Sequence, residues 1–279
     1  MPLTTLFCEG GPSSPDARVL SKLLSGLCKI DPVGSKHGMG QKILAKRETP
    51  QHKNTVAGIL DGDFLKEWKP PEGKPQVWQI SENHRIFTLG WRWERIEIEN
   101  YLVDPIVIEK TIGKDRIDLI QYKQALEQAR NDIAAYQAAR TALSANRRRL
   151  KILKSCFGSE RGKEKHHFPN DLSTPSCEEG IKNTVASHRE EQFINEKDVI
   201  ESFGHYRKEC LPDGIRYQHY LHTFSGKDLF WAMDGWLRKN RFQGASEFRE
   251  KILIGIRNTT DDIATWIQEW GEFKKMTQV

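Results

Sequence analysis

Residues 56–64 read VAGILDGDF, an apolar run that ends in two aspartates with one glycine between them. The run is short and lies between polar segments, which predicts a buried strand over its apolar part. Because side chains alternate along a strand, Asp61 and Asp63 are expected on the same side of the chain at the strand's carboxyl end. Carboxylates this close repel each other and favour a cation such as Mg²⁺, which takes oxygen ligands. The alternative is a solvated turn, since Asp-Gly-Asp is also good turn chemistry.

The composition is that of a globular chain without a membrane partner. Of its 279 residues, 37% are hydrophobic and 29% are charged, and no apolar run reaches the roughly 18–20 residues of a membrane span. Residues 1–7 lack the basic start and the apolar core of a signal peptide. The five cysteines are odd in number and form no CxxC pair, which predicts reduced thiols and a cytoplasmic location without structural zinc. The net charge of +5 permits a polyanionic partner without requiring one.

The first part of the chain, residues 1–112, carries the signals of an α/β core. Residues 3–8 read as a strand that ends at Glu9, and Pro15 and Asp16 suit the first turn of a following helix. Strand, Glu-Gly, helix, strand and Asp-Gly-Asp in this order predict an α/β fold with a parallel sheet flanked by helices. Parallel strands would bring Glu9 and both aspartates of the motif to one carboxyl edge, where the sites of α/β proteins lie.

The middle and the end of the chain are predicted to be mostly helical. Residues 113–157 form a long helical arm, because apolar residues recur in steps of three and four, with Arg140 interrupting the stripe. The stripe packs on its own domain or, as the alternative, joins two copies in a homodimer. Residues 158–195 are polar and rich in Gly, Pro and Ser, which predicts a flexible linker. Residues 196–279 are expected to be a helical region that packs back on the core.

Two further features bear on function. Residues 224–231 read FSGKDLFW and predict a helix that opens at Ser225 and Gly226, with Lys227 in a first turn whose dipole disfavours a cation. This lysine is either functional or simply exposed. A basic cluster after the arm can contact phosphates, although such a run is more often a solvated face. Its candidate nucleic-acid contacts are Arg147, Arg148, Arg149, Lys151 and Lys154.

Four pieces of the chain resemble the TOPRIM fold of topoisomerases, primases and OLD-type nucleases. They are residues 6–10 (LFCEG), 59–64 (ILDGDF), 97–102 (EIENYL) and 225–229 (SGKDL). More closely, the chain is similar to standalone TOPRIM proteins with an OLD-like site, which include the effector nuclease of the PARIS anti-phage defence system. The family's aspartate a few residues after the first glutamate has only a distant counterpart here, Asp16. The resemblance matches the family's acidic motifs and late lysine to Glu9, Asp61, Asp63, Glu97, Glu99 and Lys227.

The resemblance implies a metal-dependent nuclease that acts as a toxic anti-phage effector on DNA or on tRNA and other RNA. One or two Mg²⁺ or Mn²⁺ ions would be held by Glu9, Asp16, Asp61, Asp63, Glu97 or Glu99. Glu9 acts alternatively as a general acid or base, and Lys227 would neutralise charge on the phosphate. No GxxxxGK[ST] motif occurs in the chain, so the ATPase that accompanies many such domains would be a separate subunit. The alternative function is a catalytically silent TOPRIM-like module that assembles with an ATPase sensor.

Overall fold

The chain folds into two compact units. The computed structural model describes residues 2–49, 55–64, 67–82, 85–146, 157–159, 166–169, 171–192 and 194–278. Unit 1 consists of Met1–Gly62, Pro71–Ile117 and Glu247–Val279, and unit 2 consists of Asp63–Pro70 and Asp118–Ser246. The boundary after Gly62 falls inside the Asp-Gly-Asp motif.

Unit 1 is an α/β unit built on a five-stranded sheet, with the strand order β2-β1-β3-β5-β4. The strands are β1 (Thr5–Cys8), β2 (Lys29–Pro32), β3 (Val56–Leu60), β4 (Gln76–Glu82) and β5 (Arg85–Arg92). All neighbours are parallel except β4, which pairs with β5 antiparallel at the edge of the sheet. The prediction of a parallel sheet therefore holds for every strand pair of this sheet except β4 with β5. β4 and β5 follow each other too closely for the crossover connection that parallel strands need.

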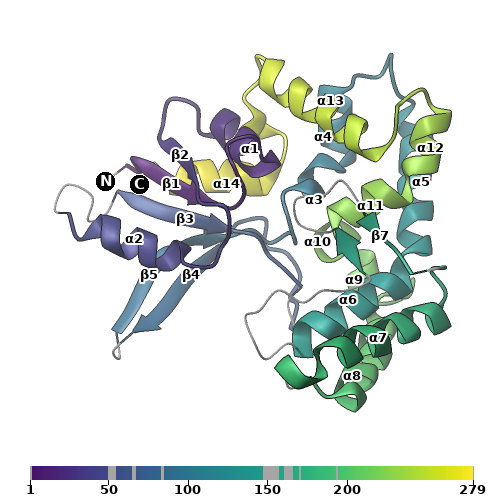
Figure 1. Cartoon of the computed structure of the whole chain (residues 1–279). Helices are drawn as coiled ribbons and strands as arrows, with labels where there is room; N and C mark the ends of the chain where they lie inside the picture. The colour runs from purple at the N-terminus through teal and green to yellow at the C-terminus, as the bar shows by residue number, and fades with distance from the viewer. Residues whose placement is uncertain are drawn as a thin grey trace. The chain divides into compact units, whose positions relative to one another are not determined.

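Helices cover both faces of this sheet. Those of unit 1 are α1 (Pro15–Leu23), α2 (Met39–Arg47), α3 (Glu99–Leu102), α4 (Pro105–Thr111), η2 (Ile263–Thr265), α14 (Gln268–Met276) and most of α13 (Ala245–Asn258). On one face, Met39 and Ile43 of α2 are buried in a core with Phe7 of β1. On the other face, Phe273 of α14 packs edge-on against Trp91 of β5. Helix α1 lies beside α14 (Figure 1), and both contact η2.

Unit 2 is helical. Its helices are α5 (Leu119–Asp132), α6 (Ala134–Asn146), α7 (Thr174–Gln192), α8 (Glu196–Glu209), α9 (Ile215–Gln218), α10 (Tyr220–Thr223), α11 (Gly226–Ala232) and α12 (Asp234–Lys239), and two short strands, β6 (Gly158–Ser159) and β7 (His166–His167), pair antiparallel. The predicted arm is two helices that meet at Ile133. Helix α6 packs on α7 and α8, and α5 packs on α11. Leu126, Ile133 and Leu143 of the heptad stripe are buried, as a stripe that packs within its own chain predicts, and the homodimer stays a prediction.

Two of the predicted segment boundaries differ from the structure. The stretch predicted as a flexible linker contains helix α7, because Cys177, Ile181 and Val185 recur every four residues and are all buried. The polar residues around this stripe conceal it in the composition. The region 196–279 divides between the units, since its last part, Glu247–Val279, belongs to unit 1.

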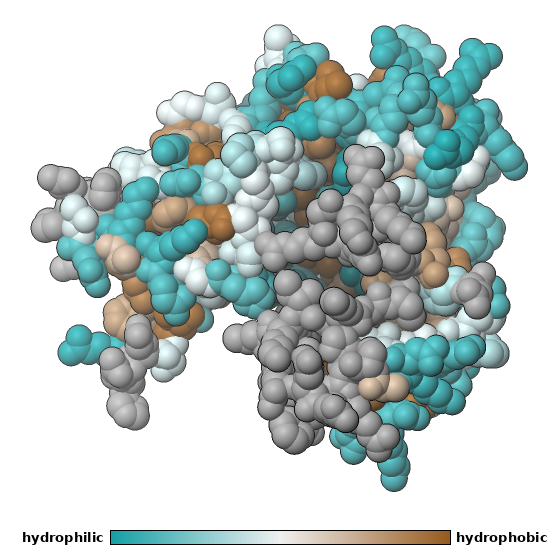
Figure 2. All heavy atoms as spheres, in the orientation of Figure 1, coloured by the Kyte–Doolittle hydropathy of each residue, from teal (hydrophilic) through white to brown (hydrophobic). Residues whose placement is uncertain are grey.

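Two further features concern the helices and cysteines of the described residues. In the part of the chain that the structure describes, no helix combines the length and the apolar character needed to cross a bilayer. Among the residues that Figure 2 colours, hydrophilic and intermediate ones outnumber the hydrophobic ones on the face drawn. The described cysteines are free thiols, at positions Cys8, Cys28, Cys177 and Cys210.

Candidate functional site

The candidate site lies at the carboxyl ends of β1 and β3 in unit 1. These strands are parallel neighbours with Thr5 opposite Val56. The order of the sheet reverses between them, because the chain moves from β1 outward to β2 and returns on the other side of β1 as β3. In open α/β sheets, ligands bind outside the carboxyl ends of the strands at such a switch point. Glu9 follows β1 and Asp61 follows β3, so the prediction that they lie at the same edge of the sheet is confirmed.

A tight turn fixes the position of Glu9. Gly10 has a φ of 78°, a left-handed conformation that glycine adopts without strain. Its N–H and C=O groups both bond to Gly34 in the loop after β2, at 3.2 and 2.8 Å. A Cβ atom at position 10 would lie 2.5 Å from Cβ of Ser14. The glycine therefore ties two loops of the carboxyl edge together directly after the acid.

Helix α1 begins beside this turn. The Ser14 Oγ accepts a hydrogen bond from the Ala17 N–H at 3.3 Å, and Pro15 occupies the first turn, which are the preferred residues at these positions. Asp16 lies in the same first turn and is half-buried. The helix start predicted from Pro15 and Asp16 is confirmed. The cap brings a second carboxylate to the edge that carries Glu9.

Gly62 lets the chain pass close to a neighbouring segment. The Gly62 N–H donates to the Arg95 carbonyl oxygen at 3.1 Å, and a Cβ atom at position 62 would lie only 2.3 Å from that oxygen. The glycine inside the Asp-Gly-Asp motif thus has a packing role. It holds Asp61 at the end of β3 beside the segment that follows β5.

Asp63 does not continue the strand geometry. Strand β3 ends at Leu60, and Asp63 has a φ of 56°, a conformation that Asp tolerates better than most residues. The strand alternation from which the sequence predicts a shared side for Asp61 and Asp63 therefore does not reach Asp63. Asp63 is also the first residue of unit 2.

The pKa of the Cys8 thiol is affected by the acids at this edge. Burial is the main cause that raises its pKa far above the ordinary value, and the negative charges of nearby acids raise it further. In order of their effect on that pKa, these acids are Asp16, Asp31, Asp61 and Glu9. Acids from four different segments therefore gather around the end of β1.

Asp31 is a member of this group that the sequence does not single out. It lies opposite Phe7 in the register of β1 and β2 and forms an ion pair of 3.8 Å with Lys46 of α2. The signal available in the sequence is an aspartate near the carboxyl end of a short strand next to β1. Arg92, at the end of β5, also lies at this edge and points a guanidinium nitrogen at the Asp61 carbonyl oxygen, 3.5 Å away.

The acids at this edge have the donor chemistry of a hard cation site. One carboxylate oxygen of Glu9 and one of Asp61 are shielded from solvent, while both residues are only half-buried. Among the residues that the structure describes, no three Asp, Glu, His or Cys side chains are already arranged as metal ligands. An all-oxygen set that draws its members from separate loops fits Mg²⁺, which commonly binds through one or two carboxylates and keeps several waters.

The two glutamates of the later acidic motif have different environments. Glu99 is 2% exposed and forms an ion pair of 3.3 Å with Arg249 of α13. Glu97 is also buried, and its backbone N–H donates to the Asn100 Oδ1 at 3.3 Å. The arginine gives Glu99 a structural role, and both glutamates stay candidate ligands through the resemblance alone.

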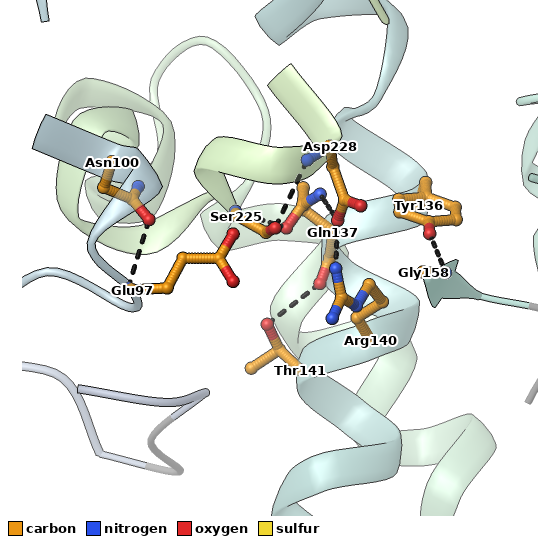
Figure 3. A network of polar contacts seen from close by, with 9 residues as sticks. All are labelled: Glu97, Asn100, Tyr136, Gln137, Arg140, Thr141, Gly158, Ser225 and Asp228. Atoms are coloured by element: carbon orange, nitrogen blue, oxygen red, sulfur yellow. Dashed lines mark hydrogen bonds and ion pairs between the residues drawn. The ribbon is translucent and has the colours of Figure 1, made fainter. Parts of the chain in front are cut away.

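The lysine motif opens a helix in unit 2, as predicted. Helix α11 begins at Gly226, and the Ser225 Oγ accepts a hydrogen bond from the Asp228 N–H at 3.3 Å. Lys227 is half-buried in its first turn. Asp228 is fully buried, and Figure 3 shows Gln137 and Arg140 of α6 pointing toward it. The residues beside Lys227 are therefore fixed to α6.

The structure does not describe the basic cluster that the sequence predicts to contact nucleic acid. Arg147, Arg148, Arg149, Lys151 and Lys154 lie outside the described residues. Their assignment to nucleic-acid contacts stays a prediction.

Comparison with models of protein families, with curated proteins and with solved structures finds no match to this chain.

Proposed function

We propose that this chain is a metal-dependent endonuclease with a TOPRIM-like sheet, and that its site is the acidic edge of β1 and β3. The observation that supports this most strongly is that Glu9 and Asp61 directly follow two parallel neighbouring strands at a topological switch point. Asp16 lies in the first turn of α1 and Asp31 lies in β2, the elements beside them. Like charges at one place disfavour each other, and clustered acids at a position where ligands bind favour a bound cation. A phosphodiester is an anion that such an edge attracts only through a metal.

The acids of unit 1 are proposed to have different roles at this edge. Glu9 and Asp61 would hold the metal, and Asp16 and Asp31 are further candidates to contribute a carboxylate or to orient water. One or two Mg²⁺ or Mn²⁺ ions would supply stabilisation of the charge that develops on the phosphodiester oxygens. Glu97 is included among the ligands because of the family resemblance.

The residues of unit 2 enter the proposal through the resemblance. Asp63 completes the DxD motif, and Lys227 would neutralise charge on the phosphate in the transition state. The basic cluster at Arg147 to Lys154 would contact the backbone of DNA or RNA without regard to sequence.

The resemblance also supplies a setting for the activity. It implies a toxic effector of anti-phage defence in the cytoplasm, held by a separate ATPase subunit. Free thiols among the described cysteines suit a reducing compartment. This part of the proposal rests on the family likeness of the four motifs.

The direct test is cleavage by the purified chain. Plasmid DNA, single-stranded DNA and total tRNA are incubated separately with Mg²⁺, with Mn²⁺ and with EDTA. We expect at least one substrate to be cut with a metal and none with EDTA. The variant Glu9→Gln should lose this activity, whereas Asp115→Asn, which removes an exposed acid of the same unit, should keep it.

Two results would count against the proposal. Cleavage that persists in EDTA or in Glu9→Gln would exclude the acidic edge as the catalytic site. Absence of cleavage with every substrate and metal, and also after addition of an ATPase partner, would favour the silent assembly module.

A further inference from the structure

Arg140 is the residue that interrupts the apolar stripe of the arm, and its contacts explain why. It lies on α6, and its Nη1 contacts the Asp228 Oδ2 in an ion pair. Its guanidinium also lies over the ring of Phe64, with 4.5 Å from Cζ to the ring centroid. One side chain thus contacts two segments that are far apart in the sequence. All three residues belong to unit 2.

The contact to Asp228 is part of a buried network. Gln137 is 0% exposed and donates from Nε2 to the same Oδ2 of Asp228 at 2.7 Å. Its Oε1 accepts a hydrogen bond from the Ser225 N–H at 3.0 Å. Asp228 is 0% exposed. Its buried negative charge is compensated by Arg140, and removing one partner of a buried pair leaves the other charge uncompensated. The first turn of α11 is therefore locked to α6.

The contact to Phe64 fixes the end of the Asp-Gly-Asp segment. Besides the ring contact with Arg140, the Phe64 carbonyl oxygen accepts a hydrogen bond from the Ser144 Oγ at 3.2 Å. Ser144 lies one helical turn after Arg140 on α6, so both hold Phe64 from the same side of the helix. A cation over an aromatic ring adds attraction that a neutral side chain lacks.

We propose that Arg140 is a positioning residue that couples the segment after Gly62 to the start of helix α11. Asp63 directly precedes Phe64, and Lys227 directly precedes Asp228, so each of these two candidate catalytic residues is one residue away from an Arg140 contact. The planar guanidinium can bond a carboxylate at its edge and cover a ring with its face at the same time, which an ammonium cannot do. The catalytic consequence rests on the proposed nuclease function, whereas the coupling itself does not.

The coupling is tested by amide hydrogen exchange, followed by mass spectrometry on the whole chain. Asp228→Asn removes the charge that holds Arg140, and Arg140→Lys keeps the charge but removes the planar fork. Both variants should raise exchange in the peptide that carries Asp63 and Phe64 by about tenfold, since hydrogen bonds to charged groups are among the stronger ones. In Asp228→Asn, this change would occur in a segment far from the substituted position in the sequence.

The matched control is Arg216→Lys. Arg216 is a buried arginine of the same unit, paired with Glu209 at 2.5 Å and placed over the ring of Tyr206 at 5.0 Å. It makes the same two kinds of contact, and these two contacts are to Glu209 and Tyr206 of α8. Exchange of the Phe64 peptide should stay at the wild-type rate in this variant.

The same variants connect the coupling to activity. Arg140→Lys should lower kcat for metal-dependent cleavage by about tenfold or more with KM nearly unchanged, because a misplaced catalytic group loses rate before it loses binding, and Arg216→Lys should keep the wild-type kcat. Unchanged exchange of the Phe64 peptide in Asp228→Asn and Arg140→Lys, or an equal rise in Arg216→Lys, would overturn the coupling. Raised exchange with an unchanged kcat in Arg140→Lys would overturn its role in positioning. A wild type that cuts no substrate would refute the nuclease function alone, since the exchange comparison still decides the coupling.

Discussion

The acids of the β1–β3 edge and the acid at the start of α11 occupy opposite electrostatic environments. Asp228 is completely buried against a guanidinium and an amide group. Around Cys8, in contrast, burial is the main cause of the raised thiol pKa, and acids from four segments raise it further. A buried acid that faces an arginine serves the fold, whereas acids gathered against one another cost stability and are typical of places where a cation binds.

Unit 1 contains both acids that pair with an arginine and the acids of the β1–β3 edge, so the two kinds can be compared within one unit. Asp104 forms an ion pair of 2.8 Å with Arg95, and each side chain is less than 10% exposed. Buried Glu99 also pairs with an arginine, Arg249, although that arginine is partly exposed. Breaking these ion pairs is expected to lower stability, whereas replacing the acids of the β1–β3 edge is expected to lower activity.

The largest expected effect is the loss of activity in Asp61→Asn. The variant should lower metal-dependent cleavage by at least about 100-fold, since a metal ligand matters at least as much as the groups that orient it. Its free energy of unfolding in urea should stay the same or increase, because one of several like charges is removed. A clear loss of stability in Asp61→Asn would make this acid structural and remove the contrast with Asp104.

The paired acids should behave in the opposite way. Arg95→Met leaves Asp104 buried without its arginine and should cost about 3–5 kcal/mol of unfolding free energy. The control is Arg18→Met, which breaks the more exposed pair of Arg18 with Glu250 and should cost less than about 1 kcal/mol. Urea unfolding of both variants measures the difference, and equal losses would show that burial does not decide the value of these pairs.

Glu269 provides a pH-dependent test of a buried acid that faces no arginine directly. Burial raises its pKa from 4.5 to about 7, against the opposing effect of hydrogen bonds from the Glu94 N–H and the Tyr101 hydroxyl. The folded protein therefore holds this proton more tightly than the unfolded chain, and stability should fall by about 3 kcal/mol as the pH rises from about 4.5 to about 7.

Removing the carboxyl group isolates this contribution. Glu269→Gln should flatten the fall of unfolding free energy over that pH range. The comparison variant is Glu250→Gln. The Arg18 hydrogen bond lowers the pKa of Glu250 in the folded protein. Glu250 therefore stabilises the fold above its unfolded pKa and loses this effect as the pH falls. Identical pH profiles of Glu269→Gln and wild type would exclude a raised pKa at Glu269.

A smaller effect is expected at the glycine of the motif. Gly62→Ala would place a Cβ atom 2.3 Å from the Arg95 carbonyl oxygen and should cost about 1–3 kcal/mol through the backbone shift that relieves the clash. At Gly11 a Cβ atom would meet nothing within 4 Å, so Gly11→Ala should be nearly neutral. Equal unfolding midpoints for the two variants would show that the close approach at Gly62 can relax freely.

Features with a local signal could be predicted from the sequence. Strands β1 and β3 follow from apolar runs that end in acids, and α1 follows from Pro15 and Asp16. Helix α8 (Glu196–Glu209) begins where the helical region 196–279 was predicted to start. The shared edge of Glu9 and Asp61 followed from the rule that parallel strands align their carboxyl ends.

Features that depend on contacts distant in the sequence could not be predicted. Asp31 belongs to the acidic edge only because β2 pairs with β1, and its short strand has no strong apolar pattern. Arg140 looked like a fault in a heptad stripe, since its partner Asp228 lies in another helix. Helix α7 was concealed because three buried residues carry its stripe in a polar stretch. In each case the deciding interaction is tertiary, which a local pattern does not contain.

The central claim is that the acids of the β1–β3 edge bind a divalent metal. Isothermal titration of the wild-type chain with Mg²⁺, in the absence of nucleic acid, tests it most directly. Saturable binding is expected in the wild type, with affinity weakened by at least about tenfold in Asp61→Asn and unchanged in the exposed-acid control Asp115→Asn. Absence of Mg²⁺ binding in the wild type, or equal affinity in the wild type and Asp61→Asn, would contradict the account.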